Sequence, residues 1–509
     1  MHAKKLIIQL LICFGLGSFS TFSLEPYKIY PLIFCFSYFI LIIYKFKSLK
    51  DIFLLSWAFA FGWFLFGLYW IGHAFLIKSN IFLYLMPFAA ILLPLFLSLI
   101  WAFAFLLSKW VSKKIGEVHI NLTIILSIVE YFRGNFLNFP WLMPGNFFSS
   151  EEYLLQGFSF IGSYSMNLVF FILIILPILI FKYYRRTIWP ILLLSFPIIC
   201  LFFNSYYRYN NRNLEYFDKI HMIKIIQPNI KQKLKWKKRL KSSHHMTLVD
   251  LSQSVNQTKK ALSVLYIWPE TALLGVYPRD KNLITNLSQK FLNKNKEEYL
   301  FTGIISKKKN KYYNSAILLN SKKQIENIYN KNILVPFGEY LPLRNLLPKI
   351  KLFENKVDFL SGKKNMVIAV NNFYNFIPLI CYEIIFSNII FKSMDEKTSL
   401  IVNITNDAWF GNSIGPVQHF QFSKIRAAEF GIPVVRVANT GFSGFISPYG
   451  EVLEKLQIYE KGSLSFNLIN KLETTLYKKY GDKIFLILIL VLYTFSIVFN
   501  RKIQRKENE

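Results

Sequence analysis

Residues that bind metals or form disulfides are scarce in this chain of 509 residues, which has four cysteines and seven histidines. Cys13, Cys35 and Cys200 lie inside apolar runs, and we expect them to be small buried hydrophobic residues. Cys381 is the one cysteine in the polar part of the sequence, so that part has no partner for an internal disulfide. The histidines show no metal-ligand spacing, and we therefore expect neither a metal ion nor another cofactor.

Acidic residues are also few, because 29 Asp and Glu stand against 60 Lys and Arg, giving a formal net charge of +31. A charge of this size fits nucleic acid, anionic lipid or a compositional bias. No RNA-binding signature accompanies the lysines. We therefore attribute the charge to a compositional bias together with attraction to an anionic membrane surface, and we expect no nucleic-acid partner.

Apolar runs, in contrast, are long and numerous, and apolar residues make up 53% of the chain. A helix needs about 20 apolar residues to cross a bilayer. Candidate runs fall near 6–24, 29–44, 52–77, 81–108, 119–137, 160–181, 187–205 and 482–499. The run at 119–137 is the weakest because it carries Glu130 and Arg133, which could meet a lipid headgroup or pair with one another. The sequence predicts a membrane domain of about seven helices over 1–205, and a last span with a basic tail over 482–509.

The short loops between these runs predict the orientation in the membrane. Basic residues gather after every second span, as Lys45, Lys47 and Lys50 do after the second one, and the alternate loops have fewer. Short cytoplasmic loops carry an excess of Lys and Arg. We therefore expect both termini in the cytoplasm and the region 206–481 on the outer side.

The region 206–481 changes to short apolar runs that alternate with helical patterns. Strands are predicted at 220–226, 263–268, 299–304, 313–319, 366–371, 376–381, 399–404, 432–438 and 442–447. Helices are predicted near 243–260, 282–294, 383–394 and 418–430. Many of the strands are apolar throughout, which is typical of buried sheets covered by helices. The sequence thus predicts an α/β extramembrane domain.

Cys381 ends the strand FIPLIC and precedes the helical segment YEIIF. A thiol at such a turn lies near the positive end of a helix dipole, which lowers its pKa and favours the thiolate. The turn resembles the nucleophile elbow of hydrolases. By position alone, however, a buried structural cysteine is the more common case.

Two further residues have the chemistry of a catalytic site. Glu270 emerges after the strand in LYIWPE, and burial beside Trp268 would raise its pKa toward that of a general base. Lys331 lies in YNKNILVPFGEYLP, a loop rich in Pro, Gly and aromatic residues, and could donate to an oxyanion. A solvated acid and a surface lysine are the ordinary alternatives. Glu339 in the same loop is either a second carboxylate of the site or a loop-fixing acceptor.

Together, these motifs resemble those of a known superfamily. WPE, then KNxLVPFGE with Ile at x, then CYE, resemble the Glu–Lys–Cys constellation of the nitrilase (carbon–nitrogen hydrolase) superfamily. NITNDAWFG at 403–411, Gln418 with His419, and RAAEFGIPVVRVANTGFSGFI at 426–446 fit the same resemblance. The implied fold is an αββα sandwich.

The membrane part narrows the resemblance further. FGWFLFGLYWIGHAF at 61–75, EYFRGNFLNFPWLMPGN at 130–146 and QPNIKQKLKW at 227–236 are similar to segments of the apolipoprotein N-acyltransferase family. By this resemblance the catalytic residues are Glu270, Lys331 and Cys381, and the supporting or substrate-binding residues are Trp236, Glu339, Tyr382 and Glu383. Ile333 departs from the family, whose members usually have a histidine in this loop.

The resemblance also implies a reaction and a location. An acyl chain would pass from a phospholipid, typically phosphatidylethanolamine, to Cys381 as a thioester and then to the N-terminal amine of a diacylglyceryl-apolipoprotein. The enzyme would lie in the bacterial inner membrane with its catalytic domain on the periplasmic side. One alternative is a membrane-tethered amidase or nitrilase that acts on a soluble amide. Another is a transporter or scaffold with an inactive domain, against which the intact Glu270, Lys331 and Cys381 argue.

Overall fold

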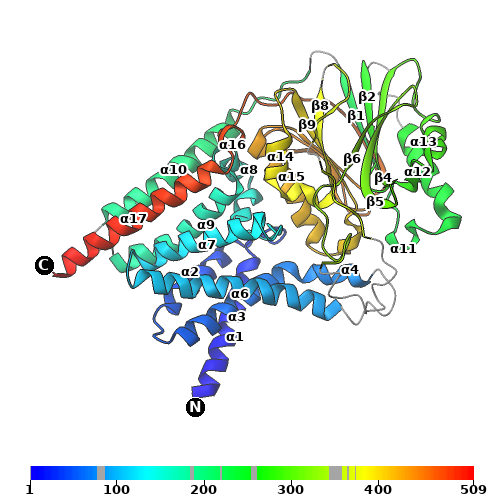
Figure 1. Cartoon of the computed structure of the whole chain (residues 1–509). Helices are drawn as coiled ribbons and strands as arrows, with labels where there is room; N and C mark the ends of the chain where they lie inside the picture. Colours follow the sequence, from blue (N-terminus) through cyan, green and yellow to red (C-terminus); the bar gives the residue numbers. More distant parts are fainter. Residues whose placement is uncertain are drawn as a thin grey trace. The chain divides into compact units, whose positions relative to one another are not determined.

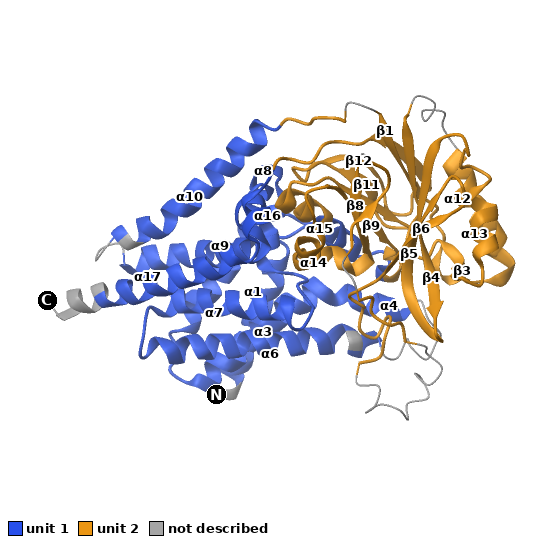
Figure 2. Ribbon diagram, turned by 45° about the horizontal axis from the view of Figure 1, so that its top comes forward, with its two compact units in different colours: residues 1–212, 410–421, 474–509 blue, residues 213–409, 422–473 orange. Residues whose placement is uncertain are grey.

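The computed structural model divides the chain into two compact units, drawn in different colours in Figure 2. It describes residues 2–76, 86–183, 188–217, 220–253, 261–342, 358–363, 366–372 and 374–508. Unit 1 consists of Met1–Arg212, Phe410–Gln421 and Thr474–Glu509, and unit 2 consists of Asn213–Trp409 and Phe422–Glu473. The two units therefore alternate along the chain.

Unit 1 is helical, and six of its helical stretches are long and apolar enough to cross a membrane within the described residues. They are Lys4–Thr21 in α1 (His2–Thr21), Leu49–Leu76 from α3 (Leu49–Leu68) through α4 (His73–Leu76), Met86–Ser112 (α6), Gly157–Tyr183 (α9), Ile191–Asn210 in α10 (Trp189–Asn210) and Lys483–Arg501 in α17 (Lys483–Asn508) (Figure 1).

The two other predicted spans give shorter or more polar helices. The run at 29–44 forms a 3-10 turn and then α2 (Phe34–Ile43), whose 10 residues rise only about 15 Å, half of a bilayer's apolar thickness. The run at 119–137 forms α7 (Val118–Asn135), which carries Glu130 and Arg133. These two side chains are fully buried and form an ion pair with one another. The Nε1 of Trp101 also donates to Glu130, at 2.9 Å.

Unit 2 is built from two mixed β-sheets. The first has the order β13-β1-β2-β4-β5-β6, with β3 paired to β4. Its strands are β1 (His221–Gln227), β2 (Ser263–Ile267), β3 (Leu273–Tyr277), β4 (Glu297–Lys308), β5 (Lys311–Asn320), β6 (Ile325–Asn330) and β13 (Gly462–Asn467). The second has the order β12-β11-β10-β9-β8-β7, made of β7 (Ile368–Ala369), β8 (Asn375–Ile380), β9 (Thr398–Thr405), β10 (Val434–Ala438), β11 (Ser443–Ile446) and β12 (Val452–Leu456).

A core between the two sheets and helices on their outer faces give the αββα layers that the sequence predicts. Ile223 and Leu265 of the first sheet share one buried cluster with Val402 and Val435 of the second. A separate cluster fills the space between the first sheet and α12 (Lys241–Gln253) and α13 (Lys281–Ser288). Helix α14 (Ser387–Ser393) and residues 422–430 of α15 (Gly415–Phe430) lie against the second sheet (Figure 1).

The nine predicted strands correspond to β1, β2, β4, β5, β7, β8, β9, β10 and β11. The sequence missed β3, β6, β12 and β13. Three of these, β6, β12 and β13, are edge strands, and their partly exposed polar residues hide the apolar pattern of a strand. The helix predicted near 383–394 is instead a 3-10 turn, η7 (Cys381–Ile385), followed by α14. The end of the helix predicted at 243–260 lies outside the described residues.

Candidate active site

Cys381 follows the last residue of β8 and opens η7 in a strained backbone conformation, with φ at +54°. A left-handed conformation is unfavourable for a residue with a Cβ and persists only where its surroundings hold it. The Nδ2 of Asn403 donates to the Cys381 carbonyl at 3.2 Å and to the Leu379 carbonyl at 3.3 Å. The expected turn, which aims the thiol away from the strand, is therefore present and is held by a side chain of the neighbouring strand β9.

The predicted effect of the turn on the thiol was wrong. Burial raises the pKa of Cys381 to about 12, and the charges of Glu270 and Asp407 act in the same direction. Lys331 and a hydrogen bond with Thr405 lower this pKa, but by less. Because η7 is a five-residue 3-10 turn, it offers little dipole to set against burial. The resting group is a thiol, which needs a base when it reacts.

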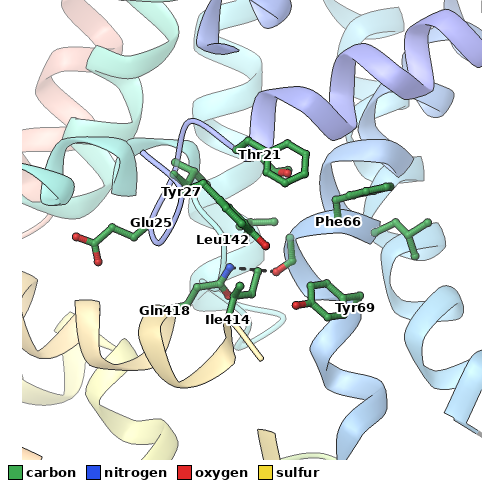
Figure 3. Close-up of a pocket in the computed structure, with 12 residues that line it drawn as sticks. Thr21, Glu25, Tyr27, Phe66, Tyr69, Leu142, Ile414 and Gln418 are labelled. Carbon is green, nitrogen blue, oxygen red and sulfur yellow. Dashed lines mark hydrogen bonds between the residues drawn. The ribbon is translucent and has the colours of Figure 1, made fainter. Parts of the chain in front are cut away.

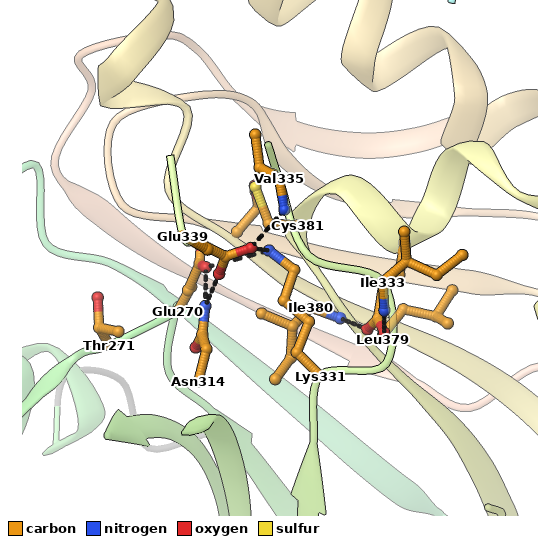
Figure 4. Close-up of polar contacts among 12 residues, drawn as sticks. Glu270, Thr271, Asn314, Lys331, Ile333, Val335, Glu339, Leu379, Ile380 and Cys381 are labelled. Carbon is orange, nitrogen blue, oxygen red and sulfur yellow. Dashed lines mark hydrogen bonds and ion pairs between the residues drawn. The ribbon is translucent and has the colours of Figure 1, made fainter. Parts of the chain in front are cut away.

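Glu270, Lys331 and Glu339 lie together beside Cys381, as Figure 4 shows. The Lys331 Nζ is 2.9 Å from Glu339 Oε2 and 3.9 Å from Glu270 Oε1. Asn314 joins the two carboxylates, because its Nδ2 donates to an oxygen of each at 2.7 Å. The Glu339 Oε2 also accepts the Val335 backbone N–H at 2.8 Å. Glu270, Lys331 and Cys381, which the sequence predicts from three separate motifs, thus lie close together.

The charges in this cluster are set by burial and by mutual attraction. Burial raises the pKa of Glu270, Lys331 opposes the rise, and Glu339 adds to it. Burial lowers the pKa of Lys331, but Glu339, Glu270 and Cys381 together outweigh burial, so that this pKa is raised. A carboxyl group with a raised pKa suits a general base, and a lysine that stays charged suits an oxyanion.

Comparison with known proteins matches both parts of the chain. A family model of the apolipoprotein N-acyltransferase N-terminal domain covers residues 16–176, and one of carbon-nitrogen hydrolase covers residues 225–474. Apolipoprotein N-acyltransferase of Rickettsia prowazekii is 32% identical over 96% of this chain and 99% of its own. The enzyme of that name from Rhodopseudomonas palustris is 30% identical over 94% and 92%. This chain belongs to the apolipoprotein N-acyltransferase family.

Two solved structures each resemble about half of this chain, at low sequence identity. Nit3 of Saccharomyces cerevisiae, of the nitrilase superfamily, has 14% sequence identity and a TM-score of 0.37, and covers 49% of this chain and 90% of its own. A variant of an amidase from Nesterenkonia AN1 has 16% identity and a TM-score of 0.36, and covers 50% and 93%. Family membership and the six apolar helices make this protein an N-acyltransferase of a membrane.

Within this family member, Glu383 is a structural carboxylate rather than an open part of the site. It is fully buried, and its Oε2 accepts the Ile380 N–H at 2.7 Å. Its Oε1 accepts from the Tyr329 hydroxyl at 2.9 Å and from the backbone N–H groups of Asn332 and Ile333 at 2.6 and 3.2 Å. It therefore ties the loop after Lys331 to the turn of Cys381. Since Ile333 makes this contact through its backbone, the family's usual histidine is not needed for it.

The other two supporting residues differ in exposure. Tyr382 is buried and packs edge-on against Phe386, with ring centroids 5.2 Å apart. Trp236 is 51% exposed at the end of α11 (Gln232–Lys235). Trp268, expected to desolvate Glu270, is fully buried, packs near Phe291 and donates to the Ser252 hydroxyl.

A lysine that the sequence does not predict lies behind Glu270. Lys235 is 2% exposed, and its Nζ donates to the Glu270 carbonyl at 3.1 Å and to the Thr271 hydroxyl at 2.9 Å. Burial lowers the pKa of Lys235 to about 8, with Glu270 opposing the shift. On the other side, a Cβ on Gly303 would lie 2.3 Å from the Thr271 nitrogen, so only glycine lets the Glu270 turn approach β4. The position of Lys235 in a lysine-rich segment gave no signal of this role.

A buried ion pair behind Cys381 was also missed. Arg436 and Asp407 are 2.7 Å apart and buried. Arg436 also donates to the Asn403 Oδ1 at 2.5 Å, and the Asp407 Oδ1 accepts from the Thr405 hydroxyl at 3.0 Å. Asn403 donates a hydrogen bond to the Cys381 carbonyl, and the Thr405 hydroxyl forms a hydrogen bond with the Cys381 sulfur. One ion pair thus supports Cys381 from two directions.

The helical unit 1 has a pocket of about 400 Å³ (Figure 3). Its lining includes Tyr27, Phe66 and Tyr69, and none of the three predicted catalytic residues. On its wall, the Oε1 of Gln418 accepts from the indole N–H groups of Trp70 and Trp141 at 3.0 and 2.8 Å. This pocket belongs to the helical unit.

Proposed function

We propose that this enzyme transfers a fatty acyl chain from a phospholipid to the N-terminal α-amino group of a diacylglyceryl-apolipoprotein, through a thioester on Cys381. The observation that carries the proposal is the cluster of one thiol, two carboxylates and one charged lysine in a domain carried by a membrane protein. Phosphatidylethanolamine is the donor that the family resemblance suggests.

In the first half of the reaction, the Cys381 sulfur attacks the ester carbonyl of the phospholipid. Because the thiol is protonated at rest, Glu270 takes its proton as the S–C bond forms. The ammonium of Lys331 stabilises the oxyanion of the tetrahedral intermediate. When this intermediate collapses, the C–O bond breaks, the proton passes from Glu270 to the leaving oxygen, and a lysophospholipid departs.

In the second half, the amine of the apolipoprotein attacks the thioester carbonyl. Glu270 accepts a proton from the attacking nitrogen, an amide forms, and the sulfur leaves as a thiol with that proton. Glu339 and Asn314 position the pair of Lys331 and Glu270 through the contacts described above. The cycle needs no other reactant, and Cys381 returns to its first state.

We also propose that the enzyme lies in the bacterial inner membrane, with both termini cytoplasmic and the catalytic region on the periplasmic side. Five of the six long apolar helices precede the catalytic region and one follows it. If α2 and α7 also cross the membrane, seven helices instead of five precede the catalytic region. Both numbers are odd, so the catalytic region lies on the same side of the membrane in either case. An Asn310→Cys variant, in the turn between β4 and β5, should react with an impermeant thiol reagent in intact spheroplasts. Labelling only after lysis would show that the catalytic region faces the cytoplasm instead.

The test of function is mass spectrometry of the purified enzyme after incubation with a phospholipid alone. We expect an acyl group on Cys381, and none in a Cys381→Ser variant that still folds and inserts. Addition of a diacylglyceryl peptide should remove the group and acylate the peptide amine. Turnover of a soluble amide without any lipid adduct would support the tethered amidase instead.

A further inference from the structure

One surface segment of unit 2 is strongly basic. Residues 231–241 read KQKLKWKKRLK and include seven Lys and Arg. They form the short helix α11, a 3-10 turn at Lys238–Leu240 and the start of α12. Five of the basic side chains are exposed, namely Lys231, Lys233, Lys237, Lys238 and Arg239. None of the five has an ion pair with another described residue, so their charge faces the solvent.

The contacts of α11 place this basic segment at the rim of the catalytic cluster. Lys235, the one basic side chain of α11 that points inward, donates to the carbonyl of Glu270. Gln232, one turn earlier, accepts a hydrogen bond from the Nδ2 of Asn406 at 2.9 Å. Glu270 follows β2 of the first sheet and Asn406 follows β9 of the second. Helix α11 therefore bridges the ends of two strands, one from each sheet, next to Glu270.

The start of the segment is fixed as firmly. Asn439 accepts the Ile230 N–H at 3.0 Å with its Oδ1 and donates to the Ile230 carbonyl at 2.8 Å with its Nδ2. Trp236, which is half exposed, stands among the lysines. Tryptophan beside basic residues is the composition of a surface that meets lipid headgroups. The segment is thus an ordered rim with the chemistry to bind a negatively charged lipid.

We propose that the basic segment 231–241 binds the headgroup of the acyl donor and selects phospholipids of net negative charge. Phosphatidylglycerol would then be a better donor for this chain than phosphatidylethanolamine, whose ammonium cancels its phosphate. This inference rests on the proposed function and departs from the donor that the family resemblance suggests. Each lysine near an anionic lipid is worth about fivefold in affinity, so several lysines suffice for a clear preference.

The experiment follows formation of the Cys381 thioester by mass spectrometry in neutral detergent micelles without an acceptor. Phosphatidylglycerol and phosphatidylethanolamine are supplied at equal mole fraction. We expect at least about fivefold faster acylation by phosphatidylglycerol, with a preference that falls as salt screens the charges. A variant with Lys231, Lys233 and Lys237 replaced by Gln should lose the preference, so that the two donors acylate its Cys381 at equal rates.

A matched control removes the same charge at the opposite end of the strands of the first sheet. Lys290, Lys294 and Lys322 are exposed near the start of β4, far along the strands from the end that carries Glu270. Their replacement by Gln should leave the preference unchanged. Equal loss in both variants would show an effect of total charge and would overturn the proposal.

A dialkyl-ether phosphatidylglycerol shows whether the basic segment binds the headgroup of the donor molecule or a charged lipid surface in general. This lipid has the headgroup of phosphatidylglycerol but no ester, so it can bind but cannot donate an acyl chain. We expect it to compete with phosphatidylethanolamine and slow the acylation of the wild-type enzyme. If the ether lipid instead accelerates acylation by phosphatidylethanolamine, the basic segment binds the lipid surface in general and not the donor. If the two ester donors acylate Cys381 at equal rates, the segment does not select the headgroup. Either result overturns the inference. If neither donor acylates Cys381, the proposed function itself fails.

Discussion

Replacing Thr405 by Val tests how the thiol of Cys381 is controlled. Valine has nearly the shape of threonine but lacks the hydroxyl. In the wild type this fully buried hydroxyl has one proton and two neighbouring acceptors. It donates to Asp407 at 3.0 Å, and when the thiolate forms the same proton can turn to the sulfur, where the hydrogen bond lowers the pKa of Cys381. Without it, the thiolate loses a donor, and the carboxylate of Asp407 loses one of its partners.

The size of the effect follows from these contacts. A hydrogen bond to a charged group contributes about 1.5–3 kcal/mol. With about 1.4 kcal/mol for each pKa unit, the pKa of Cys381 should rise by about one to two units above its already high value. Below the pKa the thiolate fraction falls about tenfold for each unit, and the greater nucleophilicity of a more basic thiolate recovers about threefold of this loss. The thiol of the variant should therefore react about 3 to 10 times more slowly at any neutral pH.

The assay measures the rate at which iodoacetamide alkylates Cys381, resolved by peptide mass spectrometry, between pH 7 and 10. The wild-type rate should rise about tenfold with each pH unit and show no plateau, because the pKa of Cys381 lies near 12. The line for Thr405→Val should run parallel and lower, and Thr405→Ser, which keeps the hydroxyl, should restore it. A Val variant that folds and reacts at the wild-type rate would refute the idea that Thr405 acts on the thiol.

Three further changes test other contacts. Lys235→Met should raise the pKa of Glu270, because a nearby positive charge is lost. The acid limb of the pH profile of thioester formation should therefore move to higher pH. Lys235→Arg, which keeps the charge, should leave the acid limb near its wild-type position. Gly303→Ala should cost about 1–3 kcal/mol or prevent folding, since its Cβ would meet backbone at 2.3 Å; Gly15→Ala, with open space around it, should melt like the wild type in the same thermal unfolding assay. Arg133→Met leaves a buried carboxylate unpaired and should lower the stability of the helical unit by about 3–5 kcal/mol in detergent, and an unchanged melting temperature would contradict the buried ion pair.

The sequence by itself determined the features that depend on local pattern. Apolar runs predicted the membrane part, and central strands such as β1, β2 and β9 stood out because both of their faces are buried. The motifs around Glu270, Lys331 and Cys381 predicted the superfamily, the fold and the reaction class. It was also the sequence that predicted burial as the cause of the raised pKa of Glu270.

Only the tertiary structure decided which side chains meet and how deeply they lie. A turn after a strand does not reveal whether burial or a helix dipole dominates, and burial wins at Cys381. The pairing of Arg436 with Asp407, and the inward path of Lys235, depend on strands and helices that are distant in the sequence. Burial, electrostatics and hydrogen bonding act through space, so the state of the Cys381 thiol emerges only once the two sheets are packed together.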